Sequence, residues 1–457
     1  MKRIAVLILA GMLLEGSAVA TAHPPRTAAQ AALPAAPEPG HLDMQAAVNQ
    51  AERWHPLVRS AQGQLLQATE GITSARGGYY PRLSAGVNST VGNDDVSGYD
   101  SRRVHRAQIT LSQMLYDFGK VGGQVDKAKA QQASAGAQVL LSLDQVARGT
   151  AQAWIAVRRN EALVKTAREQ IGAVKALAQL ARQRQTEGAS TYSDTAQADA
   201  RVDAAQVELL AAQSQVRQWQ STLLHWVGGG VLPDVAGGPL KNLAKACSPG
   251  HLSAGDAASI QVAEAQVAVA RAGVDIAKAQ RMPTVSVSVS GAHGLDAASR
   301  LPGESSVDTS VMLNLSAPLY QGGQLRADER AASYAVVAAR SALDQAHLEA
   351  DQGLQTALLQ WQQLSRQRKS QASRVESMRT TRVLYREQYL QLGTRSLLDL
   401  LNAEQEYHGA LDDQINSEHD LMNTEVDCLY YSGQLRQAFE LAPVVSAAMG
   451  PLAGSGD

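Results

Sequence analysis

Four stretches of the chain alternate apolar and small polar residues with a period of two, which is typical of β-strands with two different faces. They span residues 82–91, 104–116, 284–292 and 307–317. In the third stretch, Val285, Val287 and Val289 alternate with serines. Each stretch has about 9–12 residues, the length that a tilted strand needs to cross a bilayer. We therefore predict two strand hairpins, with one face suited to lipid and the other to water.

An ordinary solvated sheet would show the same alternation, so the flanking segments help to decide. The loops at 92–103 and 294–306 are polar and rich in Gly, Asp and Ser, and the polar strand face carries mainly uncharged side chains. Both features favour strands in a membrane. Four strands cannot close a barrel, and a lipid-exposed edge would leave backbone N–H and C=O groups unpaired. We therefore expect several chains to share one barrel.

A long helical pattern follows each hairpin. The first, from Lys120 to about Gln185, corresponds to about 100 Å of helix and contains a seam with 4-3 spacing, as in a coiled coil. The seam residues are Val139, Leu143, Val146, Thr150, Ala153, Val157, Asn160, Val164, Ala167, Ile171, Val174, Ala178 and Ala181. The second, from Gln324 to about Leu390, has a weaker seam, made of Leu343, Ala350, Leu354, Ala357, Trp361 and Leu364.

Shorter helices are expected on either side of these elements. Those at 42–78 and 255–281 lead into the hairpins, and those at 191–227 and 394–438 return antiparallel to the long helices. A proline stops each leading helix just before the strands begin. Because the helices are rich in Ala, each can pack closely on a neighbour at both sides, as in the wall of a hollow cylinder. A solid antiparallel bundle is the alternative.

The N-terminus has the pattern of a cleaved secretory signal. Lys2 and Arg3 precede the apolar run Ile4 to Leu14, and small residues follow. No later stretch reaches the length of an apolar transmembrane helix. We expect a signal peptide at 1–22, a flexible leader at 23–41, a first repeat at 42–228, a linker at 229–254, a second repeat at 255–440 and a disordered tail at 441–457.

The composition excludes several classes of function. A net charge of −2 gives no basic field, so nucleic acid is not an expected partner. No nucleotide-binding, hydrolase or zinc-protease motif is present, and the ten histidines show no metal-ligand spacing. We expect no catalytic, cofactor or metal site and no enzymatic activity. Cys247 and Cys428 could form one disulfide in an exported chain, but isolated cysteines are the favoured interpretation.

Paired motifs recur with the same order and spacing in both halves. The strand-to-helix joints read YDFG at 116–119 and YQGG at 320–323. Two turns, GASTYSD at 188–194 and GTRSLLD at 393–399, are offset by 205 residues. By these motifs the chain resembles the TolC family of outer-membrane channel proteins over nearly the whole of residues 42–440.

The resemblance implies a mainly α fold with a membrane β-barrel. Three chains, each with four strands and a tandem internal repeat, would form a twelve-stranded barrel continuous with a long periplasmic α-helical barrel. The bacterial outer membrane would hold the strands, in contact with its lipid. The implied partners are a periplasmic adaptor (membrane fusion protein) and an inner-membrane ABC or proton-driven transporter.

The resemblance also implies a gate at the periplasmic tip, where rings of acidic side chains and polar links between helices narrow the tunnel. Asp399 matches a ring aspartate, and Asn402 stands where a second aspartate is expected. Arg395 matches the gate arginine, and Asp194 matches its partner carboxylate. A ring of like charge selects cations. From the residues alone, the two aspartates are more simply explained as first-turn or capping residues after glycine turns.

The resemblance also implies a tyrosine in this gate. The matching position is Leu390 in the present sequence, next to Tyr389. The function implied by the resemblance is that of a passive exit duct, and type I protein secretion is the role that we favour. A duct for drug or metal efflux is the first alternative. A periplasmic coiled-coil adaptor or scaffold is an alternative of another class, although an adaptor would carry one coiled-coil hairpin rather than two.

Overall fold

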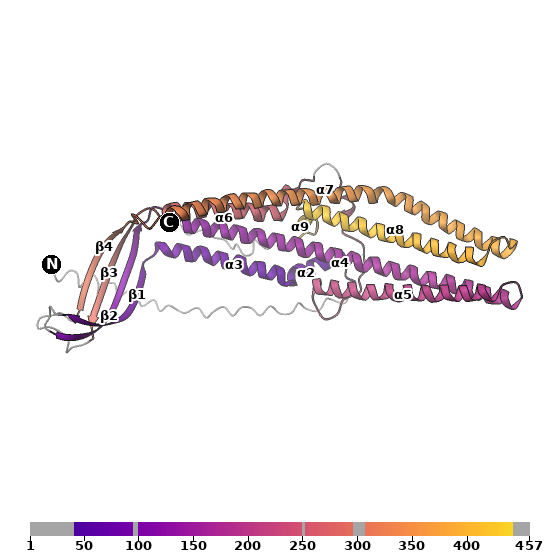
Figure 1. Ribbon diagram of the computed structural model, residues 1–457, viewed down its shortest axis with the longest axis horizontal. Coiled ribbons are helices and arrows are strands. Elements are labelled where there is room, and N and C mark those ends of the chain that lie inside the picture. The colour runs from indigo at the N-terminus through magenta and orange to yellow at the C-terminus, as the bar shows by residue number, and fades with distance from the viewer. Residues whose placement is uncertain (1–40, 95–98, 249–251, 296–306, 442–457) are drawn as a thin grey trace.

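The computed structural model describes residues 41–94, 99–248, 252–295 and 307–441. The predicted signal peptide, nearly all of the predicted leader and tail, and most of the predicted loop at 294–306 lie outside the described residues. The molecule is elongated, with a β-sheet at one end and two helical hairpin tips at the other (Figure 1).

One four-stranded antiparallel sheet forms the β end, in the order β1-β2-β3-β4. The strands are β1 (Arg82–Asp94), β2 (Tyr99–Tyr116), β3 (Thr284–Gly294) and β4 (Val307–Ser316). They match the predicted stretches to within a few residues, except that β2 begins earlier. The β2–β3 pairing joins two segments that are far apart in sequence, and β1 and β4 are edge strands within the chain.

The two faces of the sheet differ as the alternation predicts. One cross-strand row is apolar and consists of Leu83, Leu111, Val289 and Val311. The adjacent row is polar and consists of Ser84, Thr110, Ser290 and Ser310. Because neighbouring residues of a strand point to opposite faces, the rows lie on opposite sides. Leu83 and Val311 are 72% and 71% exposed within the single chain, so the apolar face is uncovered.

Eight α-helices lie within the described ranges. They are α2 (Met44–Trp54), α3 (Pro56–Arg76), α4 (Lys120–Thr186), α5 (Tyr192–Val227), α6 (Ala258–Ala279), α7 (Gln324–Glu387), α8 (Leu397–Tyr431) and α9 (Leu435–Ala438). None of them is both long and apolar enough to span a bilayer. The predicted helix at 42–78 is interrupted, because Pro56 has no N–H to continue α2 and starts α3 instead.

The helices form a row in which α4 and α7 extend over the full length of the stalk (Figure 1). Near the sheet, the packing order is α3, α4, α6 and α7; toward the tips it is α5, α4, α8 and α7. All thirteen positions of the predicted α4 seam are buried. In α7, only Ala350, Leu354 and Ala357 of the predicted seam are buried, and the other seam residues, Leu343, Trp361 and Leu364, are partly buried.

The preference for isolated cysteines was wrong, because Cys247 and Cys428 form a disulfide with Cα atoms 5.5 Å apart. Cys247 lies in the connection between α5 and α6, and Cys428 lies in the last turns of α8. Both are fully buried in the largest apolar core, together with Trp154 and Phe439. The connection folds back on α8 across a separation of 181 residues, and no local pattern in the sequence indicates such a contact.

Candidate functional site

The two helical tips are turns of the same design. Gly188 and Gly393 adopt positive φ angles of 78° and 60°, which glycine tolerates without strain. A capping box then starts each returning helix. At α5 the backbone N–H of Asp194 donates to the Thr191 hydroxyl (3.2 Å), and the Thr191 N–H donates to the Asp194 carboxylate (3.0 Å).

The same reciprocal bonds start α8. The N–H of Asp399 donates to Ser396 Oγ (3.2 Å), and the N–H of Ser396 donates to Asp399 Oδ2 (2.9 Å). These backbone hydrogen bonds, supported by the neighbouring hydroxyls, lower the pKa of both aspartates. Each carboxylate therefore stays ionised at neutral pH and stabilises its helix N-terminus. The first-turn interpretation of both aspartates is correct, and it leaves a negative charge at each tip.

Arg395 contacts its own helix pair within the chain. Its guanidinium lies over the ring of Tyr385 at 4.0 Å, and its Nε donates to Gln388 Oε1 at 3.1 Å. In the part of the chain that the structure describes, no ion pair joins Arg395 to Asp194. The sequence-predicted pair is therefore not brought together inside one chain.

Asn402 has a partner that the sequence analysis missed. Arg201 of α5 donates to Asn402 Oδ1 at 3.2 Å and to Gln405 Oε1 at 2.5 Å. Arg201 is the only basic residue between positions 185 and 216, which is the one sequence signal that could have singled it out. This contact links α5 to α8 near the tips.

A second link joins α4 to the end of α7. Tyr389 lies in a π-helical turn, Gln388–Leu392, and is buried. The guanidinium of Arg184 lies over its ring at 4.5 Å and donates to its carbonyl at 3.1 Å. Leu390, at the expected tyrosine position, is half exposed. Tyr389, and not Leu390, therefore contacts α4 of the other hairpin.

Both links between the hairpins are weak in energetic terms. Each involves a partly exposed arginine near solvent, where a polar or ionic contact contributes only about 0–1 kcal/mol. They add to a buried apolar cluster at the tips, in which Val174 and Ala181 of α4 pack with Leu401 of α8 and which also joins the two hairpins. The arrangement is chemically suited to a reversible closure rather than to catalysis.

The strand-to-helix joints have a structural role. At the first joint, the Asp117 carboxylate accepts from the N–H groups of Gly119 (3.0 Å) and Val121 (2.6 Å). Phe118 and Gly119 both have positive φ, and the Phe118 ring packs against Tyr116. The first joint therefore caps α4 and turns the chain from the sheet into the stalk.

An antiparallel sheet with one apolar face and two open edges, set on a stalk of very long helices, is the architecture of an outer-membrane channel protein. The chain belongs to the outer membrane efflux protein family, whose sequence model matches residues 47–229 and 252–430. It is accordingly a channel protein of the outer membrane and not an enzyme.

Curated relatives span most of the chain. It is 24% identical to the outer membrane efflux protein BepC of Brucella suis, over 83% of this chain and 82% of that protein. It is 23% identical to the outer membrane protein TolC of Vibrio cholerae, over 85% and 89%. A shorter match, 29% identical over 28% of this chain and 27% of that protein, is to the alkaline protease secretion protein AprF of Pseudomonas aeruginosa.

Solved structures share the fold. CusC superposes with a TM-score of 0.77 at 18% identity, covering 85% of this chain and 92% of that one. The outer membrane protein VceC of Vibrio cholerae gives 0.74 at 18% identity, covering 85% and 96%. Membership of this family excludes the alternative of a periplasmic adaptor or scaffold.

Proposed function

We propose that three copies of the chain form an exit duct, with a shared barrel in the outer membrane and a helical tunnel in the periplasm. The observation that carries this proposal is the pair of open edges at β1 and β4. A sheet edge facing lipid leaves backbone groups without partners. Pairing of β4 of one copy with β1 of the next would satisfy both edges.

The helical stalk supports the same assembly. α7 lies at one end of the helix row and exposes large apolar side chains, among them Tyr334, Val337, Leu348 and Leu359. The other end of the row, α3 and α5, exposes Leu57, Leu66, Val207 and Leu210. Contact between these surfaces in successive copies would bury both and close a ring. Apolar patches of this kind are typical of protein interfaces.

The width of the lumen argues against two copies. Two chains would give eight strands, and a barrel of that size is just wide enough to be filled by side chains. Three chains give twelve strands and leave an aqueous channel. The two halves of each chain, 42–228 and 255–440, would act as repeats. In support, the family's sequence model matches one range in each half.

The tips would act as the gate of this duct. Asp399 and Asn402 would line the constriction, and Arg395 would pair with Asp194 of a neighbouring copy, since it does not do so within its own chain. The Arg184–Tyr389 and Arg201–Asn402 contacts would hold the two hairpins of one chain together. Opening would require a periplasmic adaptor to break these weak contacts.

Type I protein secretion is the role we favour, with an inner-membrane ABC transporter as the energy source. The similarity to AprF, a protein named for protease secretion, supports it. Drug or metal efflux with a proton-driven transporter is the second candidate, supported by the similarity to the efflux protein BepC.

A deletion strain separates the two roles. Loss of one or a few large secreted proteins, restored by the intact gene and with drug and metal susceptibility unchanged, is the expected result. An unchanged secretome with increased susceptibility would instead favour efflux. The assembly itself is tested in outer-membrane extracts, where unheated samples should run at about three times the mass of the heated, monomeric chain. A monomer found only in the periplasm would contradict the duct.

A further inference from the structure

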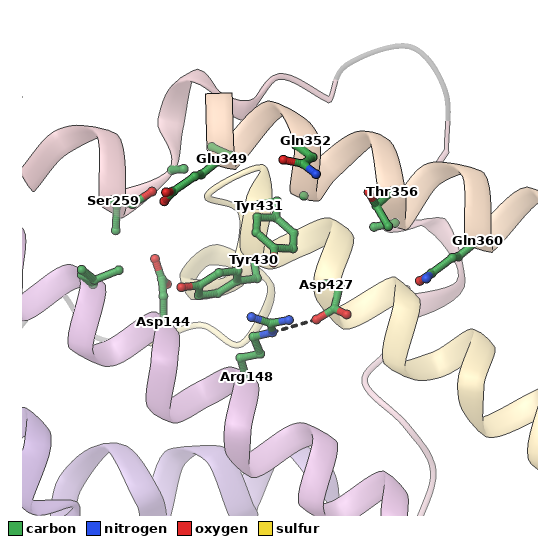
Figure 2. Close-up of a pocket in the computed structure, with 16 residues that line it drawn as sticks. Asp144, Arg148, Ser259, Glu349, Gln352, Thr356, Gln360, Asp427, Tyr430 and Tyr431 are labelled. Atoms are coloured by element: carbon green, nitrogen blue, oxygen red, sulfur yellow. Dashed lines mark hydrogen bonds and ion pairs between the residues drawn. The ribbon is translucent and has the colours of Figure 1, made fainter. Parts of the chain in front are cut away.

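A partly enclosed cavity of about 630 Å³ lies between α4 and α7, at the level where α6 begins and α8 ends (Figure 2). The cavity exists because the residues that α7 and the start of α6 present to it are small. They are Ala257, Ala258, Ala350, Gly353 and Ala357. Tyr431 forms part of the wall, because its ring lies so close to Gly353 that a Cβ there would be 2.3 Å from it.

One wall of the cavity contains a buried carboxyl group with an unused oxygen. Asp144 of α4 is 1% exposed, and its Oδ2 pairs with Arg436 of α9. Its Oδ1 is buried and has no hydrogen-bond partner among the described residues. Asp144 points into the space between α4 and α7 (Figure 2). A buried acceptor without a partner costs about 1–3 kcal/mol, so a ligand group that moves the covering side chains aside and donates to this oxygen would recover that cost.

Among the described residues that line the cavity, the one cation, Arg148, is already engaged. Nε of Arg148 donates to Asp427 Oδ1 at 2.7 Å, and the guanidinium lies over the rings of Tyr430 and Tyr431 at 4.6 and 5.3 Å (Figure 2). Gln152 donates to the same Asp427 oxygen at 3.0 Å. Arg148 is therefore not free to satisfy Asp144.

The charges around the cavity do not balance. Three carboxylates line it, from Asp144, Glu349 and Asp427, against the single guanidinium of Arg148. Arg436, behind Asp144, neutralises a second carboxylate. Glu349 accepts only a neutral amide, from Gln345 at 2.8 Å. The remaining negative charge, that of the exposed Glu349, has no counter-charge among these groups.

We propose that this cavity binds a small organic cation that carries one protonated amine. The ammonium group donates to Asp144 Oδ1 and is attracted by Glu349 on the facing wall. The apolar part of the ligand lies against the alanines and the tyrosine rings. The volume suits this class, since small-molecule sites typically enclose about 300–1,000 Å³. The site goes beyond the proposed transport function and does not depend on it.

Protonation provides a second property to measure. Burial raises the pKa of Asp144 to about 7, so the group is partly protonated near neutral pH. An ammonium ligand binds the ionised form of Asp144 in preference to the protonated form. Its binding therefore releases protons and is tighter at pH 8 than at pH 6. The charged or titratable groups around Asp144 are Arg148 of α4, Glu349 of α7, Asp427 and Tyr430 of α8 and Arg436 of α9.

The test is calorimetric titration of the purified full-length assembly in detergent, with benzylamine as the probe and benzyl alcohol as its neutral counterpart. Benzylamine should bind saturably, and benzyl alcohol should bind about tenfold or more weakly, because a charge-assisted hydrogen bond is lost. Glu349→Gln should weaken benzylamine binding by a similar factor. The matched control is Glu376→Gln, an exposed position about 40 Å further along α7, which should bind as the unmodified protein does.

Asp144→Asn should abolish the proton release as well as most of the affinity. If this variant does not fold, the result with Glu349→Gln still tests the proposal, because Glu349 is exposed and its substitution leaves the core unchanged. Equal affinity for benzylamine and benzyl alcohol, undetectable benzylamine binding, or unchanged binding in Glu349→Gln would each overturn the proposal. Weaker binding in Glu376→Gln would overturn it too, by showing a general surface effect.

Discussion

The disulfide between Cys247 and Cys428 makes a quantitative prediction about stability. In the chain-entropy model, cross-linking residues 181 positions apart restricts the unfolded chain by about 5 kcal/mol at 25 °C. We treat this as an upper value, since residual structure in the unfolded state reduces it. Replacing both cysteines by alanine avoids burying new hydroxyl groups at two positions that are 0% exposed.

The expected effect on melting follows from chain length. For a chain this long, 1 kcal/mol corresponds to about 1–2 °C, by extension of the scaling for smaller domains. The variant Cys247→Ala/Cys428→Ala should therefore melt up to about 5–10 °C lower. Thermal unfolding of the purified protein, followed by circular dichroism at matched detergent and protein concentrations, measures the shift.

The single variants supply the control for this prediction. Either substitution alone removes the bridge, so Cys247→Ala and Cys428→Ala should each lose nearly as much stability as the double variant. If the losses instead add, they come from two independent cavities in the core and not from the cross-link. An unchanged melting temperature in the double variant would refute the reasoning altogether.

Three further predictions concern the tips and the buried acids. Arg395→Ser should raise single-channel conductance in planar bilayers, and Asp399→Ala should weaken cation selectivity; unchanged values in both would remove these residues from the gate. Arg201→Ser should raise the open probability of the channel, by less than about tenfold because the lost contact is weak. An unaltered open probability would contradict a role for the α5–α8 link. Burial raises the pKa of Asp144 and of Glu425 to about 7, well above the unfolded values near 4. The folded state thus binds more protons between about pH 4 and 7, and the free energy of unfolding should rise as the pH falls from 8 to 5, by up to about 5 kcal/mol for the two groups together. A melting temperature that is flat or falls over this range would contradict the assignment.

Features that repeat locally along the chain could be predicted from the sequence. The strands follow from alternation of side chains over a few residues, and the α4 seam follows from spacing that continues for more than forty residues, Val139 to Ala181. In both cases the periodicity of the backbone itself decides which residues share a face.

Contacts between distant segments could not be predicted. The disulfide depends on how the α5–α6 connection folds back, and the Arg201–Asn402 contact depends on how α5 and α8 align. The burial of Tyr389 could not be predicted either, because it depends on the π-helical turn at Gln388–Leu392, which turns side chains to other directions than a regular helix does. The tip aspartates were found through their turn motifs, but their hydrogen bonds show only a capping role within one chain.

The two open edges of the sheet have a consequence for genetics. If three copies complete one barrel, a copy with a damaged β1 or β4 spoils every barrel that it enters. When damaged and intact chains are made in equal amounts and mix freely, only about one barrel in eight contains intact chains alone. A proline placed in the middle of either edge strand should therefore be dominant over the intact gene, although it alters a single copy of the chain.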